Sequence, residues 1–303
     1  MILNSTKWKD FDGYIATDPI AIFQSHYALK DMGQSEKLSA LLLDGPPGVG
    51  KTFLGKHLAK LLKAELIHFQ VFPGCDRSDM IWDSTYAKSG GAEEGVLLQA
   101  ISKSQDHPVV LLLDELDKSD VRVDSFLLNF LNEGFLFVPQ LRVRQATSQN
   151  LLIVITKNDQ RDASAPLLRR CRVVYMNWPT VEIETRILRQ TTPALTDEAC
   201  AKLLEIPNRL RINPEIIKAP STNEMMRVAP DLLELIQRQA NPLLVGEYFI
   251  NAIAQNISDR RFIEKSPLYI GMAIIEALGV SAASHQPPSA SLLEAEVNYF
   301  INE

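Results

Sequence analysis

Short apolar runs alternate with longer stretches of helical periodicity over the first 178 residues of the chain. The apolar runs are unbroken rather than alternating, which is typical of strands buried on both faces of a parallel sheet. Strands separated by helical stretches predict an α/β fold, a three-layer αβα core with a five-stranded parallel sheet. The expected strands are 40–43, 66–71, 109–113, 151–155 and 173–176.

The pattern changes at Pro179, where the β-rich runs end and helical periodicity takes over. Thr180, Thr196 and Ser221 are helix start signals, and Glu224 gives Ser221 the spacing of a capping box. A second, all-α domain is therefore expected after the αβα core.

Two further features divide this helical region. Pro207 and Pro214 predict an irregular connection within it. Residues 281–291, SAASHQPPSAS, are small, polar and proline-rich and predict a flexible linker before an amphipathic stretch at 292–302. We therefore expect an αβα domain at 1–178, a helical lid domain at 179–280, and a linker with a C-terminal helix at 281–303.

Composition limits the class of protein. The chain is 46% hydrophobic and 22% charged, as in an ordinary soluble globular protein. Its formal net charge is −6 and it has no block of Lys or Arg, so we expect no nucleic-acid partner. Its three cysteines are far apart, which favours a reducing compartment over a disulfide or zinc framework. Because no apolar run has the length of a signal peptide or a membrane helix, we expect a cytoplasmic protein without a membrane partner.

Residues 45–52 read GPPGVGKT and match the pattern GxxxxGK[ST] between an apolar run and a helical stretch. The glycines let backbone N–H groups turn towards phosphate oxygens, and the following helix adds the positive end of its dipole. Lys51 would reach the outer phosphates, and the Thr52 hydroxyl would be a ligand of Mg²⁺. The pattern predicts ATP and Mg²⁺ as cofactors, with nucleotide-binding residues Gly45, Pro46, Pro47, Gly48, Val49, Gly50, Lys51, Thr52 and Phe53.

The run 109–113 ends in Asp114 and Glu115, so both carboxylates should emerge at the C-terminal edge of the sheet. Ligands of open α/β sheets bind at that edge. Asp114 is then placed to hold Mg²⁺ together with Thr52, and Glu115 to orient or deprotonate the attacking water. These residues predict phosphoryl transfer to water, which is ATP hydrolysis.

Polar residues next to these segments have two interpretations each. Asn158 follows the run 151–155 at the same edge and could hydrogen-bond the γ-phosphate or the attacking water, with a simple turn residue as the alternative. Asp117 and Lys118 are interpreted as solvated loop charge, with a contact to a neighbouring subunit as the alternative.

Three arginines, Arg169, Arg170 and Arg172, lie at the end of a short helical pattern before the last expected strand. The planar guanidinium binds phosphate oxygens in a bidentate manner, so this cluster suits phosphate recognition. Basic residues also stabilise the C-terminal end of a helix, so part of the cluster has a structural explanation.

Taken in this order, the phosphate loop, the Asp-Glu pair, the strand-end Asn and the helix-end arginines resemble an AAA+ ATPase. Within that superfamily the chain is most similar to the MoxR branch. The segments that carry the resemblance are GYIATDP at 13–19, DRSDMIWDSTYAKSGGAEEGVLLQAI at 76–101, SDVRVDSFLLNFLNEGFLFVP at 119–139 and KAPSTNEMMR at 218–227.

The resemblance implies a homo-oligomeric ring, commonly a hexamer, in which an arginine finger from one subunit completes the ATP site of the next. Arg170 precedes Cys171 as the finger does in AAA+ clamp-loader subunits, so Arg170 is the first choice and Arg169 the second. MoxR proteins act as chaperone-like activators, typically with a von Willebrand factor A-type partner, so a partner of this type and a protein substrate are expected.

Two alternative functions are also compatible with the sequence. The Arg-Arg-Cys ending is also compatible with a DNA-handling subunit of the clamp-loader type. The sensor-2 arginine of many AAA+ proteins is replaced at the expected helix start by residues 221–224, with Arg227 one turn later as a substitute. This departure is compatible with a nucleotide-gated scaffold that hydrolyses slowly.

Overall fold

The computed structural model describes residues 10–11, 14–15, 18–83, 93–138, 142–158, 160–254, 257–263 and 267–278. The predicted linker and C-terminal helix at 281–303 lie outside these residues. The chain divides into two compact units, Met1–Trp178 and Pro179–Glu303. None of the helices in the described ranges is long and apolar enough to cross a membrane.

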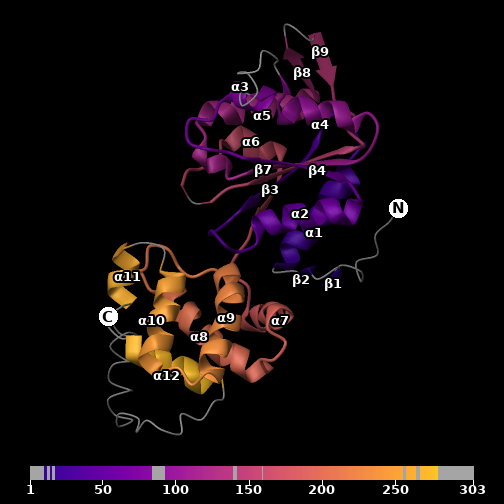
Figure 1. The fold of residues 1–303 in the computed structure, drawn as a ribbon. Coiled ribbons are helices and arrows are strands. Elements are labelled where there is room, and N and C mark those ends of the chain that lie inside the picture. The colour runs from indigo at the N-terminus through magenta and orange to yellow at the C-terminus, as the bar shows by residue number, and fades with distance from the viewer. Residues whose placement is uncertain are drawn as a thin grey trace. The chain divides into compact units, whose positions relative to one another are not determined.

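The first unit is built on a five-stranded sheet in which every neighbouring pair of strands is parallel. The strand order is β11-β3-β10-β7-β4. The strands are β3 (Ser39–Asp44), β4 (Glu65–Gln70), β7 (Val109–Asp114), β10 (Leu151–Thr156) and β11 (Arg172–Tyr175). The order places β3, β10 and β7 in the centre, so the loops after these strands meet at one edge of the sheet (Figure 1).

The expectation that all five strands are buried on both faces holds only for the centre of the sheet. Every residue of β3, β7 and β10 is buried, whereas β4 and β11 have partly exposed residues. The physical reason is position: β4 and β11 are the two edge strands, which helices cover less completely.

Helices cover both faces of the sheet and complete the three layers (Figure 1). Alternate strand residues pack on opposite faces, because successive side chains of a strand point in opposite directions. Leu41, Leu43 and Leu112 share one apolar cluster with α1 (Pro19–Asp31) and α2 (Lys51–Leu62). The other face packs against α4 (Val96–Ser104), α5 (Val121–Glu133) and α6 (Ala165–Arg170). The predicted αβα core is confirmed.

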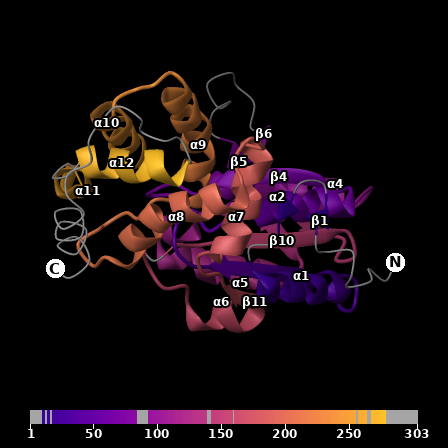
Figure 2. The same cartoon turned by 90° about the horizontal axis from the view of Figure 1, so that it is seen from below.

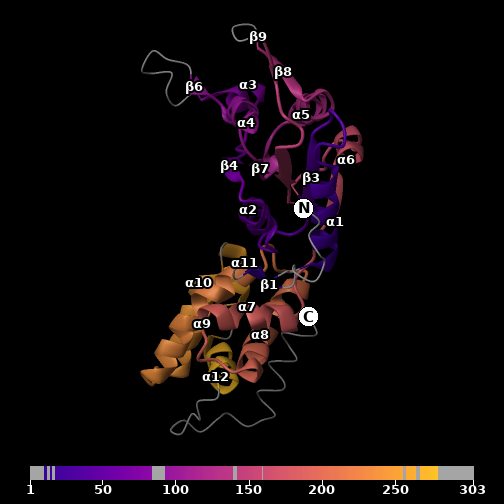
Figure 3. The ribbon, with the colours of Figure 1, turned by 90° about the vertical axis from the view of Figure 1, so that its right-hand side faces the viewer.

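Smaller elements decorate this unit. They are the strand pairs β1 (Asp10–Phe11) with β2 (Tyr14–Ile15), β5 (Trp82–Asp83) with β6 (Glu93–Glu94) and β8 (Phe135–Val138) with β9 (Arg142–Gln145), the helix α3 (Arg77–Ile81), and the 3₁₀ turn η3 (Leu116–Lys118). The β8–β9 hairpin extends beyond α5, away from the sheet (Figures 1 and 3).

The second unit is all α-helical in its described residues. Its helices are α7 (Val181–Thr191), α8 (Asp197–Ile212), α9 (Thr222–Gln237), α10 (Pro242–Ile253), α11 (Ile257–Ile263) and α12 (Pro267–Ala277). Helix α10 lies side by side with α12 (Figures 1 and 2). A continuous apolar core joins residues of α7, α8, α9, α10, α11 and α12.

Two features of this unit test the sequence predictions: the capping box at the start of α9 and the connection predicted from Pro207 and Pro214. The capping box is present, since the Ser221 side chain accepts from the Glu224 N–H and the Glu224 side chain accepts from the Ser221 N–H. The irregular connection predicted from Pro207 and Pro214 is present at 213–221, which includes Pro214, but its predicted start at Pro207 was wrong because α8 continues through this proline to Ile212. Pro207 is buried, so its ring contributes apolar packing that offsets the missing N–H.

Candidate functional site

The loop between β3 and α2 has the backbone of a phosphate-binding loop. Gly45, Gly48 and Gly50 have φ values of 141°, 87° and 99°, which side chains other than glycine rarely adopt. A Cβ atom on Gly45 would lie 2.1 Å from the carbonyl oxygen of Met176, so only glycine fits where the loop passes the end of β11. Gly50 caps α2 without a side-chain hydrogen bond, so the first N–H groups of the helix can bind an anion.

Lys51 and Thr52 begin α2 and face the loop and the sheet. The Lys51 ammonium donates to the carbonyl oxygens of Gly45 and Pro46, at 2.6 and 2.7 Å, and its residue is only 5% exposed. The Thr52 hydroxyl donates to Asp114 Oδ1 across 2.8 Å. The loop therefore brings a buried cation and a hydroxyl to the C-terminal edge of β7.

Asp114 is the last residue of β7 and is the centre of a polar cluster. Its Oδ1 atom accepts from the hydroxyls of Thr52 and Thr156, the latter at 2.6 Å, and its Oδ2 atom lies 3.3 Å from His68 Nε2. A buried carboxylate next to a threonine hydroxyl is the oxygen donor set that Mg²⁺ prefers. Thr52 and Asp114 therefore fit the metal that a phosphate loop requires.

Glu115 has a strained backbone, with φ 62° and ψ 49° in the left-handed region. Its N–H donates to the Thr156 hydroxyl at 2.9 Å, which supports this conformation. Its carboxylate accepts from Lys118 Nζ at 2.5 Å and from the side-chain amide of Gln70. Strain of this kind persists only where surrounding contacts hold it and is concentrated at functional sites.

Asn158 lies beside Glu115, as expected from the two strand ends. Its Nδ2 atom is 3.4 Å from Glu115 Oε1, and its backbone N–H donates to Asp117 Oδ1 at 2.9 Å. Asp117 is only 6% exposed, and Lys118 binds Glu115, so the interpretation of these two residues as solvated loop charge was wrong. Their side chains turn inward because the η3 turn folds them back onto the site.

Sequence reasoning missed several residues of this cluster. Gln70 and Thr156 are the last residues of β4 and β10, and His68 lies two residues before the end of β4. The signal that could have found Gln70 and Thr156 is a polar residue ending an apolar run next to β7. Lys118 gave no local signal, because its contact with Glu115 depends on the turn at η3.

The helix-end arginines occupy three different environments. Arg170 Nη2 donates to the carbonyl oxygens of Leu38 and Leu131, both at 2.7 Å, and burial lowers the pKa of its guanidinium. Arg172 binds Asp31 at 2.6 Å. Arg169 is exposed, and its guanidinium has no hydrogen-bond partner in the described part of the chain. Arg170 is thus bonded within its own chain, whereas Arg169 is accessible, and the choice of Arg170 before Arg169 as the finger stays a prediction.

The remaining residues of the phosphate loop differ in their exposure. Val49 is 1% exposed and anchors the loop in the apolar core, whereas Pro47, Gly48 and Phe53 are exposed. The loop is therefore anchored in the apolar core at Val49, while Pro47 and Gly48 are exposed to solvent.

Comparisons with known proteins agree with this site. Residues 40–171 match the family model described as AAA domain (dynein-related subfamily). These residues are thus similar to AAA domains, and the match agrees with the P-loop fold of the first unit.

Similar curated proteins include Lon proteases. The Lon protease of Desulforamulus reducens is 29% identical over 186 residues, which cover 59% of this chain and 23% of that protein. The mitochondrial Lon protease homologue of Yarrowia lipolytica is 35% identical over 145 residues, 45% of this chain and 12% of the homologue. The mitochondrial homologue 1 of Dictyostelium discoideum is 28% identical over 242 residues, 73% of this chain and 25% of the homologue. The chain spans a quarter or less of the length of these three relatives.

Proposed function

We propose that this protein hydrolyses ATP with Mg²⁺ and uses the reaction to remodel or activate a partner protein. The observation that carries the proposal is the contact between Thr52 and Asp114 at 2.8 Å, with Glu115 adjacent in the chain. It unites the phosphate loop with the acidic strand end, which are 62 residues apart. This contact supports a single Mg-nucleotide site built from both segments.

The residues have separate roles in this proposal. The loop N–H groups and Lys51 bind the phosphates, and Thr52 and Asp114 would hold Mg²⁺, which when bound neutralises charge on the phosphate oxygens. Glu115 accepts the proton of the attacking water, and Asn158, which lies beside Glu115, orients that water. Gln70 and Lys118 hold the Glu115 carboxylate by hydrogen bonds.

Turnover of wild type, Lys51→Ala and Glu115→Gln tests the hydrolysis directly. Lys51→Ala should lose nucleotide binding, and Glu115→Gln should bind nucleotide but lose turnover. Lys56→Ala, an exposed lysine on the same helix, and Glu133→Gln, an exposed glutamate at the end of α5, are matched controls that should behave as wild type. Equal turnover in all five proteins would contradict the proposal.

We further infer a homo-oligomeric ring, commonly a hexamer in the MoxR branch, in which an arginine completes the neighbour's site. Accessible Arg169 supports this arrangement, and Arg170 is the alternative from the motif. Mixing Arg169→Ala with Glu115→Gln subunits should restore part of the turnover, because a Glu115→Gln subunit supplies its arginine to an intact site. No recovery with Arg169→Ala, but recovery with Arg170→Ala, would return the role to Arg170.

The substrate is proposed to be a protein, with a von Willebrand factor A-type protein as the partner. The MoxR-like segments support that partner, whereas the similar Lon proteases represent a different AAA+ branch whose name refers to action on proteins. Three free cysteines, Cys75, Cys171 and Cys200, support a cytoplasmic location. Stimulation of turnover by a co-purified von Willebrand-type protein would test the branch, and no binding between the two proteins would contradict it.

A slow, nucleotide-gated scaffold is the second candidate. It is favoured by Arg227, the substitute for a sensor-2 arginine, because its guanidinium donates to the carbonyl oxygen of Ala252 inside the second unit. Tight nucleotide binding without measurable turnover, also in the presence of the partner, would favour this function over hydrolysis.

A further inference from the structure

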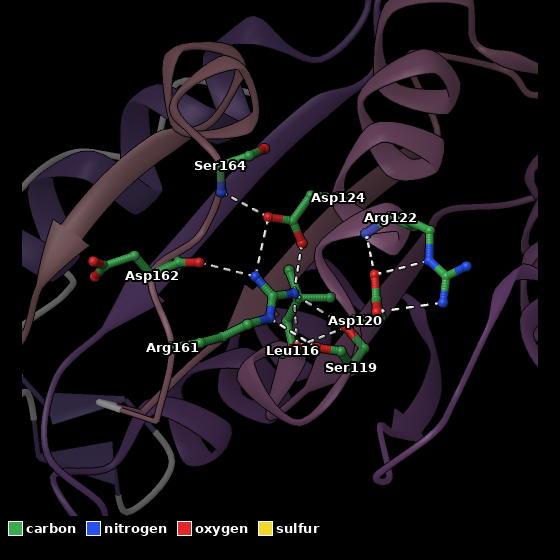
Figure 4. Close-up of polar contacts among 8 residues, drawn as sticks. All are labelled: Leu116, Ser119, Asp120, Arg122, Asp124, Arg161, Asp162 and Ser164. Atoms are coloured by element: carbon green, nitrogen blue, oxygen red, sulfur yellow. Dashed lines mark hydrogen bonds and ion pairs between the residues drawn. The ribbon is translucent and has the colours of Figure 1, made fainter.

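Arg161 lies in the segment between β10 and α6 and is the centre of a dense polar network (Figure 4). Its guanidinium makes six hydrogen bonds within 3.2 Å. The acceptors are the carbonyl oxygens of Leu116, Ser119 and Asp162, the hydroxyl of Ser119, and both carboxylate oxygens of Asp124. The site described above gives Arg161 no role, so these six hydrogen bonds need an explanation of their own.

Asp124 fixes the orientation of this guanidinium. Its side chain is fully buried on α5 and binds Arg161 in a bidentate manner, at 2.6 and 3.1 Å. Asp124 Oδ2 also accepts the N–H of Ser164 at 2.6 Å. Paired, charge-assisted hydrogen bonds of this geometry are strong and directional, so Arg161 and Asp124 form a rigid unit.

The network joins the segments that carry the hydrolysis residues. Leu116 follows Glu115 directly and begins the η3 turn, and Ser119 follows the turn's last residue, Lys118, which binds Glu115. Arg161 comes three residues after Asn158, and Ser164 is the N-cap of α6, which carries Arg169. One guanidinium therefore connects the turn after Glu115 with the segment that follows Asn158 and with the start of α6.

We propose that Arg161, held by Asp124, is a positioning residue for hydrolysis, which fixes Glu115 and Asn158 relative to each other. The proposal rests on the proposed ATPase function. Glu115 has a left-handed backbone that must be held by its surroundings, and Arg161 binds the carbonyl oxygens at both ends of the turn that follows it. The six bonds of Arg161 involve no residue of the phosphate loop, so nucleotide binding is separable from this role.

The first test compares nucleotide affinity with turnover in Arg161→Ala, Arg161→Lys and Asp124→Asn. Turnover per bound nucleotide should fall by roughly 10-fold to 100-fold, because small displacements of reacting groups have effects of this size. The dissociation constant should stay within about threefold of wild type, as for an interaction used only in the reaction. Arg161→Lys should recover part of the loss, since an ammonium can bind Asp124 but cannot also reach both turn carbonyls.

Arg122→Ala is the matched control. Arg122 pairs with Asp120 at 3.0 Å in the neighbouring stretch of chain, but the Arg122 side chain is 88% exposed (Figure 4). This variant removes an arginine–aspartate pair without touching the η3 turn, so it should keep wild-type turnover. An equal loss in Arg122→Ala and Arg161→Ala would overturn the proposal.

Hydrogen exchange of the full chain gives a readout that does not depend on turnover. In Arg161→Ala the backbone N–H groups of 116–119 and 161–164 should exchange faster, while those of 45–52 should be unchanged. If Arg161→Ala does not fold, Arg161→Lys and Asp124→Asn carry the same comparison. Unchanged exchange, or turnover and affinity lost in equal proportion, would overturn the proposal. Absence of turnover in wild type would contradict the ATPase function instead, and the exchange result would still decide whether Arg161 orders the two segments.

Discussion

The carboxylate of Asp117 accepts the backbone N–H of Asn158 across 2.9 Å, and so joins the turn after Glu115 to the segment after β10. The other carboxylate oxygen, Oδ2, is buried and has no hydrogen-bond partner among the described residues. Asp117 therefore contributes one strong contact to the site while burying a second oxygen without compensation.

Replacement of Asp117 should separate these two effects. Asp117→Ala leaves the Asn158 N–H without its acceptor and should lower the free energy of unfolding by roughly 1–3 kcal/mol. Asp117→Asn keeps an acceptor oxygen and removes a buried charge, so it should change this free energy by less than about 1 kcal/mol. Urea unfolding of both variants measures the difference. Equal destabilisation would show that the hydrogen bond to Asn158 does not account for the contribution of Asp117 to stability.

Replacing Arg169 and replacing Arg170 should affect different properties of the protein. Arg170→Ala removes two charge-assisted hydrogen bonds to buried carbonyls and should lower the free energy of unfolding by roughly 1.5–3 kcal/mol. Arg169→Ala should change it by less than about 0.5 kcal/mol, as at other exposed positions. If Arg169 acts on the neighbouring subunit, its variant should lose turnover by roughly 10³-fold to 10⁵-fold with nucleotide binding kept.

Denaturant unfolding and turnover, measured on the same preparations, check this assignment. A stable Arg170→Ala variant that lacks turnover would instead support Arg170 as the arginine finger, as its position before Cys171 predicts.

Lys157 and Asp44 form a buried ion pair at the same sheet edge, with 2.7 Å between Nζ and Oδ1 and side chains 6% and 11% exposed. Lys157→Ala should lower the free energy of unfolding by about 3–5 kcal/mol, because it leaves the Asp44 charge buried and unpaired. The double variant Lys157→Met with Asp44→Asn should be less destabilised than Lys157→Ala alone. Urea unfolding decides this, and a double variant destabilised as much as Lys157→Ala or more would contradict the prediction.

The Cys75 thiol should make the free energy of unfolding fall as the pH rises. Burial and, secondarily, the charge of Asp79 raise the pKa of its thiol from 9.0 to about 11. The folded state thus favours the neutral thiol, so its contribution to stability is complete below about pH 9 and is lost as the pH rises towards 11. Relative to Cys75→Ala, the wild type should lose roughly 1 kcal/mol of unfolding free energy between about pH 9 and pH 10. An unchanged difference across this range would show that the thiol titrates normally when folded.

Local patterns were sufficient to predict the architecture. The αβα core was predictable because the unbroken apolar runs of β3, β7 and β10 reflect burial on both faces, a property of each segment alone. The capping box at Ser221 was predictable for the same reason, since both of its partners lie within one helical turn.

Contacts between distant segments were not predictable in this way. Arg170 bonds to Leu38, 132 residues away, and no pattern near Arg170 distinguishes this contact from an exposed finger. Asp117 and Lys118 have the composition of a solvated loop, and only the fold of η3 turns them inward. The sequence thus predicted that Thr52 and Asp114 meet at the sheet edge, whereas the contributions of Gln70 and Thr156 required the three-dimensional arrangement.

Calorimetric titration with a non-hydrolysable ATP analogue and Mg²⁺ tests the central claim most directly. The account predicts saturable uptake by the wild type and by Glu115→Gln, loss of uptake in Lys51→Ala, and weakened dependence on Mg²⁺ in Asp114→Asn. No uptake by the wild type, or the same uptake by Lys51→Ala, would contradict it.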